Sequence, residues 1–262
     1  MTSLAAAIRA ALLTPTPRDK VFATRALVRA WRKGALTATF DQPMPDQPAW
    51  PGTLELLPPN RMPKRGKGGS ERNRIALWHS IAHIEFVAID LALDIVGRFG
   101  GQMGPGFIDD FLSVAADEAM HFVLVDRKLR SLGAQYTCLP AHNGLWDAAL
   151  ETRHDVAARL AVVPMVLEAR GLDVTPATID RVRESGDLGG ARILQRILDD
   201  EIRHVAAGAR HFNAWCETHA ETPETLWKTL VARHYRGLLK PPFNDSARLA
   251  AGLSRDWYGA VA

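Results

Sequence analysis

Glutamates and histidines interrupt four long apolar segments, and this feature constrains the fold most. Apolar residues recur at helical spacing in segments that we expect to form helices over residues 70–98, 105–132, 143–170 and 187–219. The first and third segments carry a lone glutamate, and the second and fourth carry a Glu-x-x-His pair. The candidate metal ligands are Glu85, Glu118, His121, Glu168, Glu201 and His204. An ionised carboxylate in an apolar core is costly unless a cation compensates it, so the pattern predicts a metal site.

The spacing of these residues predicts two helical hairpins. Glu85 precedes Glu118 by 33 residues, and Glu168 precedes Glu201 by the same interval. The midpoint of each interval lies at or beside a turn, so each lone glutamate is expected level with a Glu-x-x-His pair. A Glu and a His three residues apart project from one helix face. We therefore expect four carboxylates and two imidazoles to converge.

Chance does not account for the Glu-x-x-His pairs. Random placement of 11 Glu and 9 His in 262 residues would give about 0.4 such pairs, and the chain has three. The third pair, Glu151 and His154, lies 17 residues before Glu168 on the predicted third helix. That is about 25 Å along a helix, so we expect this pair to lie outside the site. It serves as an internal control.

The remaining segments complete an all-α prediction, with an antiparallel bundle of four long helices. Residues 1–33 are expected to be helical with a break at residues 14–17, and residues 41–63 hold seven of the 16 prolines. Such a Pro-rich stretch predicts an extended arm, anchored by Trp50, Leu54, Leu56 and Leu57. We therefore expect residues 1–69 to form N-terminal helices and an arm that pack on the bundle. Residues 70–262 would form the bundle and short C-terminal helices after Pro223 and Asn244.

Composition excludes several classes of protein. Only two cysteines occur, which excludes a disulfide scaffold and an all-cysteine metal cluster within one chain and fits a reducing, cytoplasmic compartment. No segment approaches the roughly 18 apolar residues of a membrane span. The net charge of +3 permits a nucleic-acid partner without requiring one. A basic run suited to phosphate contact lies at Lys64, Arg65, Lys67, Arg72 and Arg74, although such runs are usually solvated loops.

Three residues near the candidate ligands allow a second interpretation. Pro164 lies one turn before Glu168, so it is expected to kink or bulge the third helix, either opening a metal-facing pocket or serving packing alone. His79 and His83 share a helix with Glu85 but are rotated away from it. We expect them to be hydrogen-bonded core or inter-helix residues; the alternative is that either supports the metal ligands from behind.

The motifs resemble those of a known superfamily. The string Asp200-Glu201-Ile202-Arg203-His204 is similar to the Asp-Glu-x-Arg-His signature of bacterial di-iron monooxygenases and acyl-carrier desaturases, and the first copy, Asp117 to His121, departs from it at Met120. Together with His83-Ile84-Glu85 and the box of residues 168–173, the chain resembles the ferritin-like di-iron carboxylate superfamily. It is most similar to an uncharacterised branch, domain of unknown function 455, that is related to tRNA-hydroxylating monooxygenases. The resemblance implies a ferritin-like four-helix bundle.

The resemblance also implies a role for each ligand. Each ion would have one terminal glutamate and one terminal histidine, Glu85 with His121 and Glu168 with His204. The two other glutamates, Glu118 and Glu201, would bridge the ions.

Three neighbours of the ligands would act behind them. By the same resemblance, Asp117 and Asp200 would each accept the second N–H of the opposite histidine and so fix its tautomer. The alternative for these aspartates is plain surface charge. Arg203 would pair with Asp117 across the bundle or face solvent.

The implied cofactors are two iron ions, with manganese as the other candidate. An oxygen and imidazole ligand set suits both metals and disfavours copper(I) or zinc–thiolate chemistry. We expect an O2-activating oxidoreductase, a hydroxylase, monooxygenase or oxidase that needs an external electron donor, with no catalytic residue beyond the metal ligands. The substrate would be a small molecule or a tRNA, and the sequence leaves the oligomeric state open. The alternatives are an iron-binding or iron-storage protein and a protein similar to manganese catalase.

Overall fold

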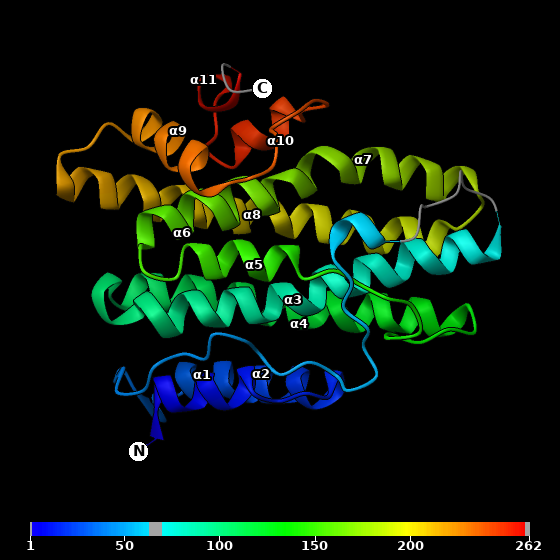
Figure 1. Ribbon diagram of the computed structural model, residues 1–262, viewed down its shortest axis with the longest axis horizontal. Coiled ribbons are helices and arrows are strands. Elements are labelled where there is room, and N and C mark those ends of the chain that lie inside the picture. The colour runs from blue at the N-terminus through cyan, green and yellow to red at the C-terminus, as the bar shows by residue number, and fades with distance from the viewer. Residues whose placement is uncertain (1, 63–69, 260–262) are drawn as a thin grey trace. The chain divides into compact units, whose positions relative to one another are not determined.

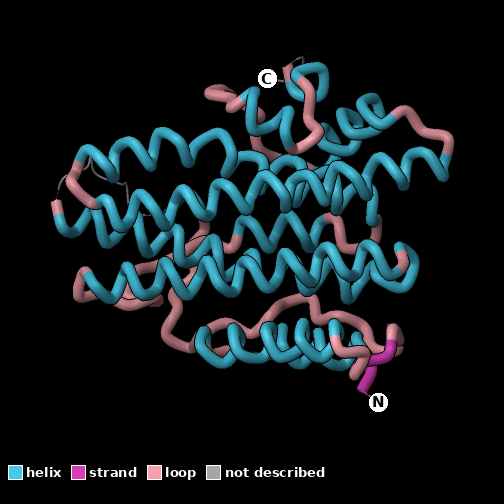
Figure 2. The backbone as a smooth tube through the Cα atoms, turned by 180° about the vertical axis from the view of Figure 1, so that it is seen from behind, coloured by secondary structure: helices cyan, strands magenta, loops and turns pink. Residues whose placement is uncertain are grey.

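Helices make up most of the part of the chain that the structure describes. The structure, a computed structural model, describes residues 2–62 and 70–259. Within these ranges the only strands are β1 (Thr2–Ser3) and β2 (Leu36–Thr37), a short parallel pair beside the N-terminus (Figure 2). The all-α class is therefore confirmed. The chain divides into two compact units, residues 1–146 and residues 147–262.

The first unit is built on two long antiparallel helices (Figure 1). Its helices are α1 (Leu4–Leu12), α2 (Pro17–Arg32), the 3-10 turn η1 (Pro59–Arg61), α3 (Glu71–Met103), α4 (Pro105–Ser131) and the start of α5 (Gly144–Glu151). The Ser70 hydroxyl caps α3 by accepting the N–H of Asn73. Gly104 separates α3 from α4 with a φ of 85°, a conformation that favours glycine, and Pro105 then begins α4.

The described part of the Pro-rich arm has no α-helix, and it contains turns and the 3-10 turn η1. Backbone carbonyls of the arm accept hydrogen bonds from two helices: Arg98 of α3 donates to the carbonyl of Pro45 at 2.7 Å, and Trp146 Nε1 of α5 donates to the carbonyl of Asp46 at 2.9 Å. The Trp50 ring lies 6.1 Å from the His83 ring and 6.3 Å from the Phe86 ring. The other expected anchors are half-buried: Leu54, Leu56 and Leu57.

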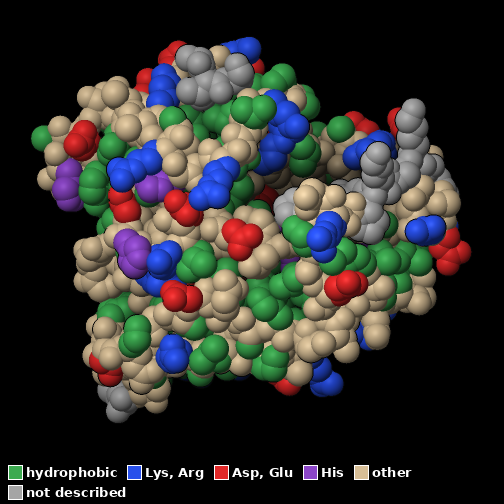
Figure 3. Space-filling model, in the orientation of Figure 1, with side chains coloured by type: hydrophobic (Ala, Val, Ile, Leu, Met, Phe, Trp, Pro, Cys, Tyr) green, Lys and Arg blue, Asp and Glu red, His purple; other side chains and the backbone are tan. Residues whose placement is uncertain are grey.

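The boundary at residue 69 and most of the basic run lie outside the described residues. Lys64, Arg65 and Lys67 belong to the segment 63–69, so the predicted domain division there stays a prediction. Arg72 and Arg74 lie in the first turn of α3 and are exposed. On the face drawn in Figure 3, basic side chains are interspersed with acidic and apolar ones.

The second unit is also helical. It contains the end of α5, α6 (Val156–Val162), the π-helical segment η2 (Val163–Glu168), α7 (Ala169–Glu184), α8 (Leu188–His219), α9 (Pro223–His234), α10 (Asp245–Ala250) and α11 (Arg255–Tyr258). The two longer helices, α7 and α8, are joined by a tight turn with Gly186 at a φ of 82° and pack against each other. Asp187 caps α8 by accepting the N–H of Gly190 at 2.8 Å.

The predicted helix over residues 143–170 is wrong in two respects. The chain leaves the helix after Glu151, and Asp155 then starts a new helix by accepting the N–H of Ala158 at 3.0 Å. From Val156 the helical path continues through η2 into α7, so it passes Gly171, the expected end, and reaches Glu184. The control pair Glu151 and His154 consequently lies at the end of α5 and in the following turn.

None of the helices within the described ranges combines the length and the apolar character that crossing a membrane would need.

Candidate metal centre

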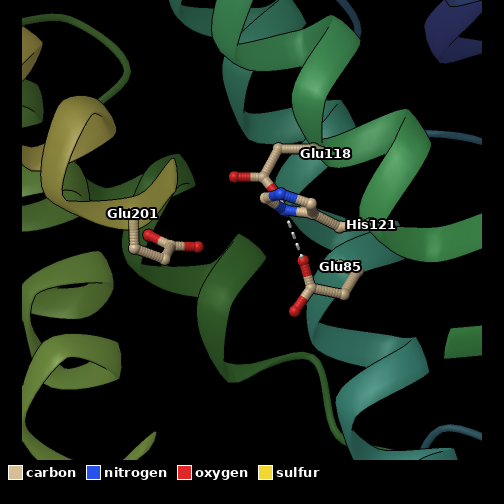
Figure 4. A group of neighbouring side chains, drawn as sticks. All are labelled: Glu85, Glu118, His121 and Glu201. Carbon is tan, nitrogen blue, oxygen red and sulfur yellow. Dashed lines mark hydrogen bonds and ion pairs between the residues drawn. The ribbon is translucent and has the colours of Figure 1, made fainter. Parts of the chain in front are cut away.

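Three of the predicted ligands meet in the first unit. Glu85 projects from α3, and Glu118 and His121 project from one face of α4 (Figure 4). His121 Nδ1 lies 3.2 Å from Glu118 Oε2 and 3.4 Å from Glu85 Oε2. One potential ligand atom from each of the three residues lies within 4.8 Å of the others. The antiparallel pairing of α3 and α4 therefore brings two carboxylates and one imidazole to one point.

All three side chains are buried, and burial together with their mutual contacts shifts the pKa values of Glu85 and His121. Glu85 is 4% exposed, and Glu118 and His121 are fully buried. Burial raises the pKa of Glu85 to about 7; the hydrogen bond with His121 opposes this shift and the Glu118 charge adds to it. Burial alone would lower the pKa of His121, but hydrogen bonds to Glu118 and Glu85 and their charges raise it to about 12. A protonated His121 would supply positive charge to the two carboxylates beside it.

Two further histidines of α3 are held as core residues, as expected. His79 Nε2 accepts the N–H groups of Thr137 and Leu139 at 3.1 and 3.4 Å. His83 Nε2 is 3.0 Å from the carbonyl of His142, so it carries the proton, and Nδ1 accepts from the Tyr136 hydroxyl at 2.8 Å. Burial lowers the pKa of both imidazoles to about 4, so both are neutral near pH 7.

The second unit carries the other three predicted ligands. Glu201 and His204 lie on one face of α8, with His204 Nδ1 3.9 Å from Glu201 Oε2. His204 is 1% exposed, and the Glu201 side chain is 13% exposed. Glu168 is half-buried and is the last residue of η2, which packs against α8. The second unit thus repeats the residue set of the first, with one glutamate on a π-helical turn instead of a regular α-helix.

The three residues expected to support the ligands differ in burial. Asp200 is buried and accepts hydrogen bonds from Arg196 Nε at 2.6 Å and from Arg203 Nη2, both on its own helix. The Arg203 side chain is 62% exposed. Asp117 is half-buried on α4. The roles of the two aspartates toward the histidines stay predictions.

Comparison with known proteins identifies a family. The family described as "Protein of unknown function (DUF455)" matches residues 13–259. The chain belongs to this family. An "Uncharacterized protein" of Haemophilus influenzae is 39% identical to the DUF455 chain over 218 residues, which cover 80% of this chain and 75% of the relative. No solved structure matches the chain significantly.

The donor set of the DUF455 protein fits a metal ion. Two buried carboxylates and an imidazole supply oxygen and nitrogen ligands, which suit divalent first-row metals. His121 directs Nδ1 at both carboxylates, so a metal bound there would replace the Nδ1 proton. A bound cation would compensate the Glu85 and Glu118 carboxylates in their ionised form and so oppose the effect of burial on the pKa of Glu85.

Two structurally important residues of the DUF455 protein, Tyr136 and Gly208, belong to no motif in the sequence. Tyr136 follows α4 in the chain, and its ring centroid lies 5.3 Å from Phe86 and 5.4 Å from Phe122, the neighbours of two ligands. Its separation of 50 residues from Phe86 hid this contact. Gly208 lies four residues after His204, in a run of small residues that marks a close helix approach.

Proposed function

We propose that this DUF455 protein is a ferritin-like protein with a dinuclear metal–carboxylate centre, in which both units contribute ligands. The observation that carries the proposal is the buried group of Glu85, Glu118 and His121 in the first unit. The second unit supports the proposal, because it repeats the same residue types with the same spacing of 33 residues between its two glutamates. Glu118 and Glu201 would bridge the two ions. Glu85 and His121 would bind one ion, and Glu168 and His204 would bind the other.

Charge and ligand chemistry favour iron as the bound metal. Four carboxylates balance the four positive charges of two divalent ions, so the centre would be neutral. Carboxylate oxygens and imidazole nitrogens without thiolates suit iron or manganese. Both described Glu–His pairs direct Nδ1 at a carboxylate oxygen, so both histidines would bind through Nδ1 and keep Nε2 for a hydrogen-bond acceptor.

The function that such a centre supports best is an O2-activating oxidoreductase. The bound metals would supply O2 activation, which no protein side chain provides. The residues of this chain would hold the ions, neutralise them and exclude water, which the full burial of Glu118 and His121 favours. Electrons would come from an external donor, and the substrate would be a small molecule or a tRNA.

Metal stoichiometry tests the centre. After anaerobic loading with Fe²⁺ and removal of unbound ions, the protein is expected to retain two iron ions per chain. The Glu118→Ala/Glu201→Ala variant removes both bridging carboxylates and is expected to retain less than one ion. Glu151→Ala is the matched control, because Glu151 begins the third Glu-x-x-His pair and is exposed. Equal iron content in all three proteins would refute the proposed ligands.

Oxygen consumption tests the activity separately. The reduced, iron-loaded protein is expected to consume O2 and to continue only while an external reductant is supplied. Retention of two ions without O2 consumption would leave the metal centre standing and reject the oxidoreductase. Uptake far beyond two ions per chain would instead indicate iron storage, and peroxide disproportionation by the manganese-loaded protein would indicate a catalase.

A further inference from the structure

Gly208 of α8 lies against the π-helical segment that ends in Glu168. A Cβ atom built on Gly208 would lie 2.5 Å from Pro164 Cβ and 2.6 Å from Pro164 Cγ. Both distances are far below a van der Waals contact, and the proline ring cannot rotate away as a flexible side chain would. The two backbones can therefore approach this closely only because residue 208 has no side chain.

The contact between Pro164 and Gly208 lies close in sequence to the candidate ligands Glu168 and His204. Pro164 lies four residues before Glu168, and Gly208 lies four residues after His204. Because the segment containing η2 and α7 runs antiparallel to α8, the Pro164–Gly208 level is one helical turn from the Glu168–His204 level. Glu201, His204 and Gly208 follow the i, i+3, i+7 pattern of one helix face.

We propose that Gly208 is a positioning residue for the metal centre. Its missing side chain lets η2 lie against α8 and so fixes the distance from Glu168 to Glu201 and His204. This inference rests on the proposed function and goes beyond it, because Gly208 itself is no ligand.

The first unit reaches the same ligand set by a different packing. The residue four positions after His121 is Val125, a fully buried side chain, and the residue four positions before Glu85 is Ile81, in the regular α-helix α3. The close backbone approach thus belongs to the second unit alone among the described ligand pairs. A change at Gly208 is consequently expected to affect one ion more than the other.

A single added methyl group would separate the two segments. To bring the new Cβ of Gly208→Ala from 2.5 Å to the 3.4 Å of an ordinary contact with Pro164, the segments must move apart by about 0.9 Å. Metal–ligand distances vary by only about 0.2 Å within a functional site, so Glu168 would lose its position.

Anaerobic calorimetric titration with Fe²⁺ tests the inference. Wild type is expected to bind two ions, and Gly208→Ala is expected to bind the first ion normally and the second at least about tenfold more weakly. Gly171→Ala is the matched control: Gly171 lies in α7, and a Cβ there would meet nothing within 4 Å, so normal binding of both ions is expected. A merely structural role of Gly208 would weaken both ions alike.

A second variant separates a packing effect from misfolding. Gly208→Ala/Pro164→Gly removes the two atoms that the new methyl group would meet, and it is expected to regain the second ion. Normal binding of both ions by Gly208→Ala, or no recovery in the double variant, would overturn the role of Gly208 while the proposed function stands. Wild type that binds no iron would reject the proposed function and this inference with it.

Discussion

Pro176 lies inside α7, where a proline removes one helical hydrogen bond. The carbonyl that its missing N–H would have bonded belongs to Leu172, four residues earlier. Asn244 compensates for this loss, since its Nδ2 donates to the Leu172 carbonyl at 3.1 Å. The sequence alone suggested that the helix ends at Gly171, because the partner that lets the helix continue lies 72 residues away.

This replacement bond gives a prediction for Asn244. Asn244→Ser keeps a side-chain oxygen that can cap α10, as Asn244 Oδ1 does for the N–H of Ala247, but it loses the donor to Leu172. The variant is expected to lose about 1–3 kcal/mol of unfolding free energy, because a buried carbonyl is left without that donor. Urea denaturation measures the change.

Pro176→Ala provides the control, because alanine restores an N–H that can reach the Leu172 carbonyl. It is expected to stabilise Asn244→Ser more than it stabilises wild type, with a coupling energy above about 0.5 kcal/mol. Equal stabilisation in both backgrounds would contradict the assigned bond.

Lys20 and Asp90 form a buried ion pair that ties α2 to α3. Lys20 Nζ lies 2.6 Å from both carboxylate oxygens, and both side chains are fully buried. The ammonium group also lies 4.9 Å from the centre of the Phe86 ring. Burial raises the pKa of Asp90 to about 6, although the charge and hydrogen bonds of Lys20 lower it. The helix pattern predicted both helices. It could not predict that the charge of Asp90 is compensated by Lys20, which lies 70 positions earlier in the chain.

Breaking this pair is expected to be costly and pH-dependent. Lys20→Met leaves a buried carboxylate without its cation, and we expect a loss of about 3–5 kcal/mol near pH 8. The pKa of Asp90 should then rise further above its value in the unfolded chain. The folded variant would bind more protons than the unfolded one between these two pKa values, so its stability should increase as the pH falls from about 8 to 5.

Urea denaturation at both pH values checks this expectation. Lys20→Met/Asp90→Leu is the control, because replacing a buried pair by apolar residues is often neutral, and its stability should be close to that of wild type. A loss in Lys20→Met that is equal at both pH values would show that Asp90 does not carry the uncompensated charge.

The two units carry matching halves of the candidate ligand set. The sequence could predict these halves, because the equal spacing of glutamates around each turn is a property of the chain itself. The meeting of Glu85, Glu118 and His121 follows from the antiparallel pairing of α3 and α4. The π-helical turn before Glu168 was less accessible: Pro164 indicated a distortion, but the close approach to Gly208 depends on tertiary packing. Metal binding by either half stays a prediction.

A shared dinuclear centre predicts that the two units stabilise each other when metal binds. Glu201→Ala/His204→Ala changes only the second unit, yet it removes one bridging carboxylate of the proposed centre. Hydrogen exchange of α4, in the first unit, measures the effect. At a free Fe²⁺ concentration of about 100 times Kd, metal should slow exchange of wild-type α4 by up to about 100-fold, and the variant should lose most of that protection.

The reciprocal variant, Glu118→Ala/His121→Ala, should likewise lower protection of α8, and Glu151→Ala should change neither helix. Independent mononuclear sites would instead leave the metal-dependent protection of α4 intact in the first variant, because its own ligands are untouched.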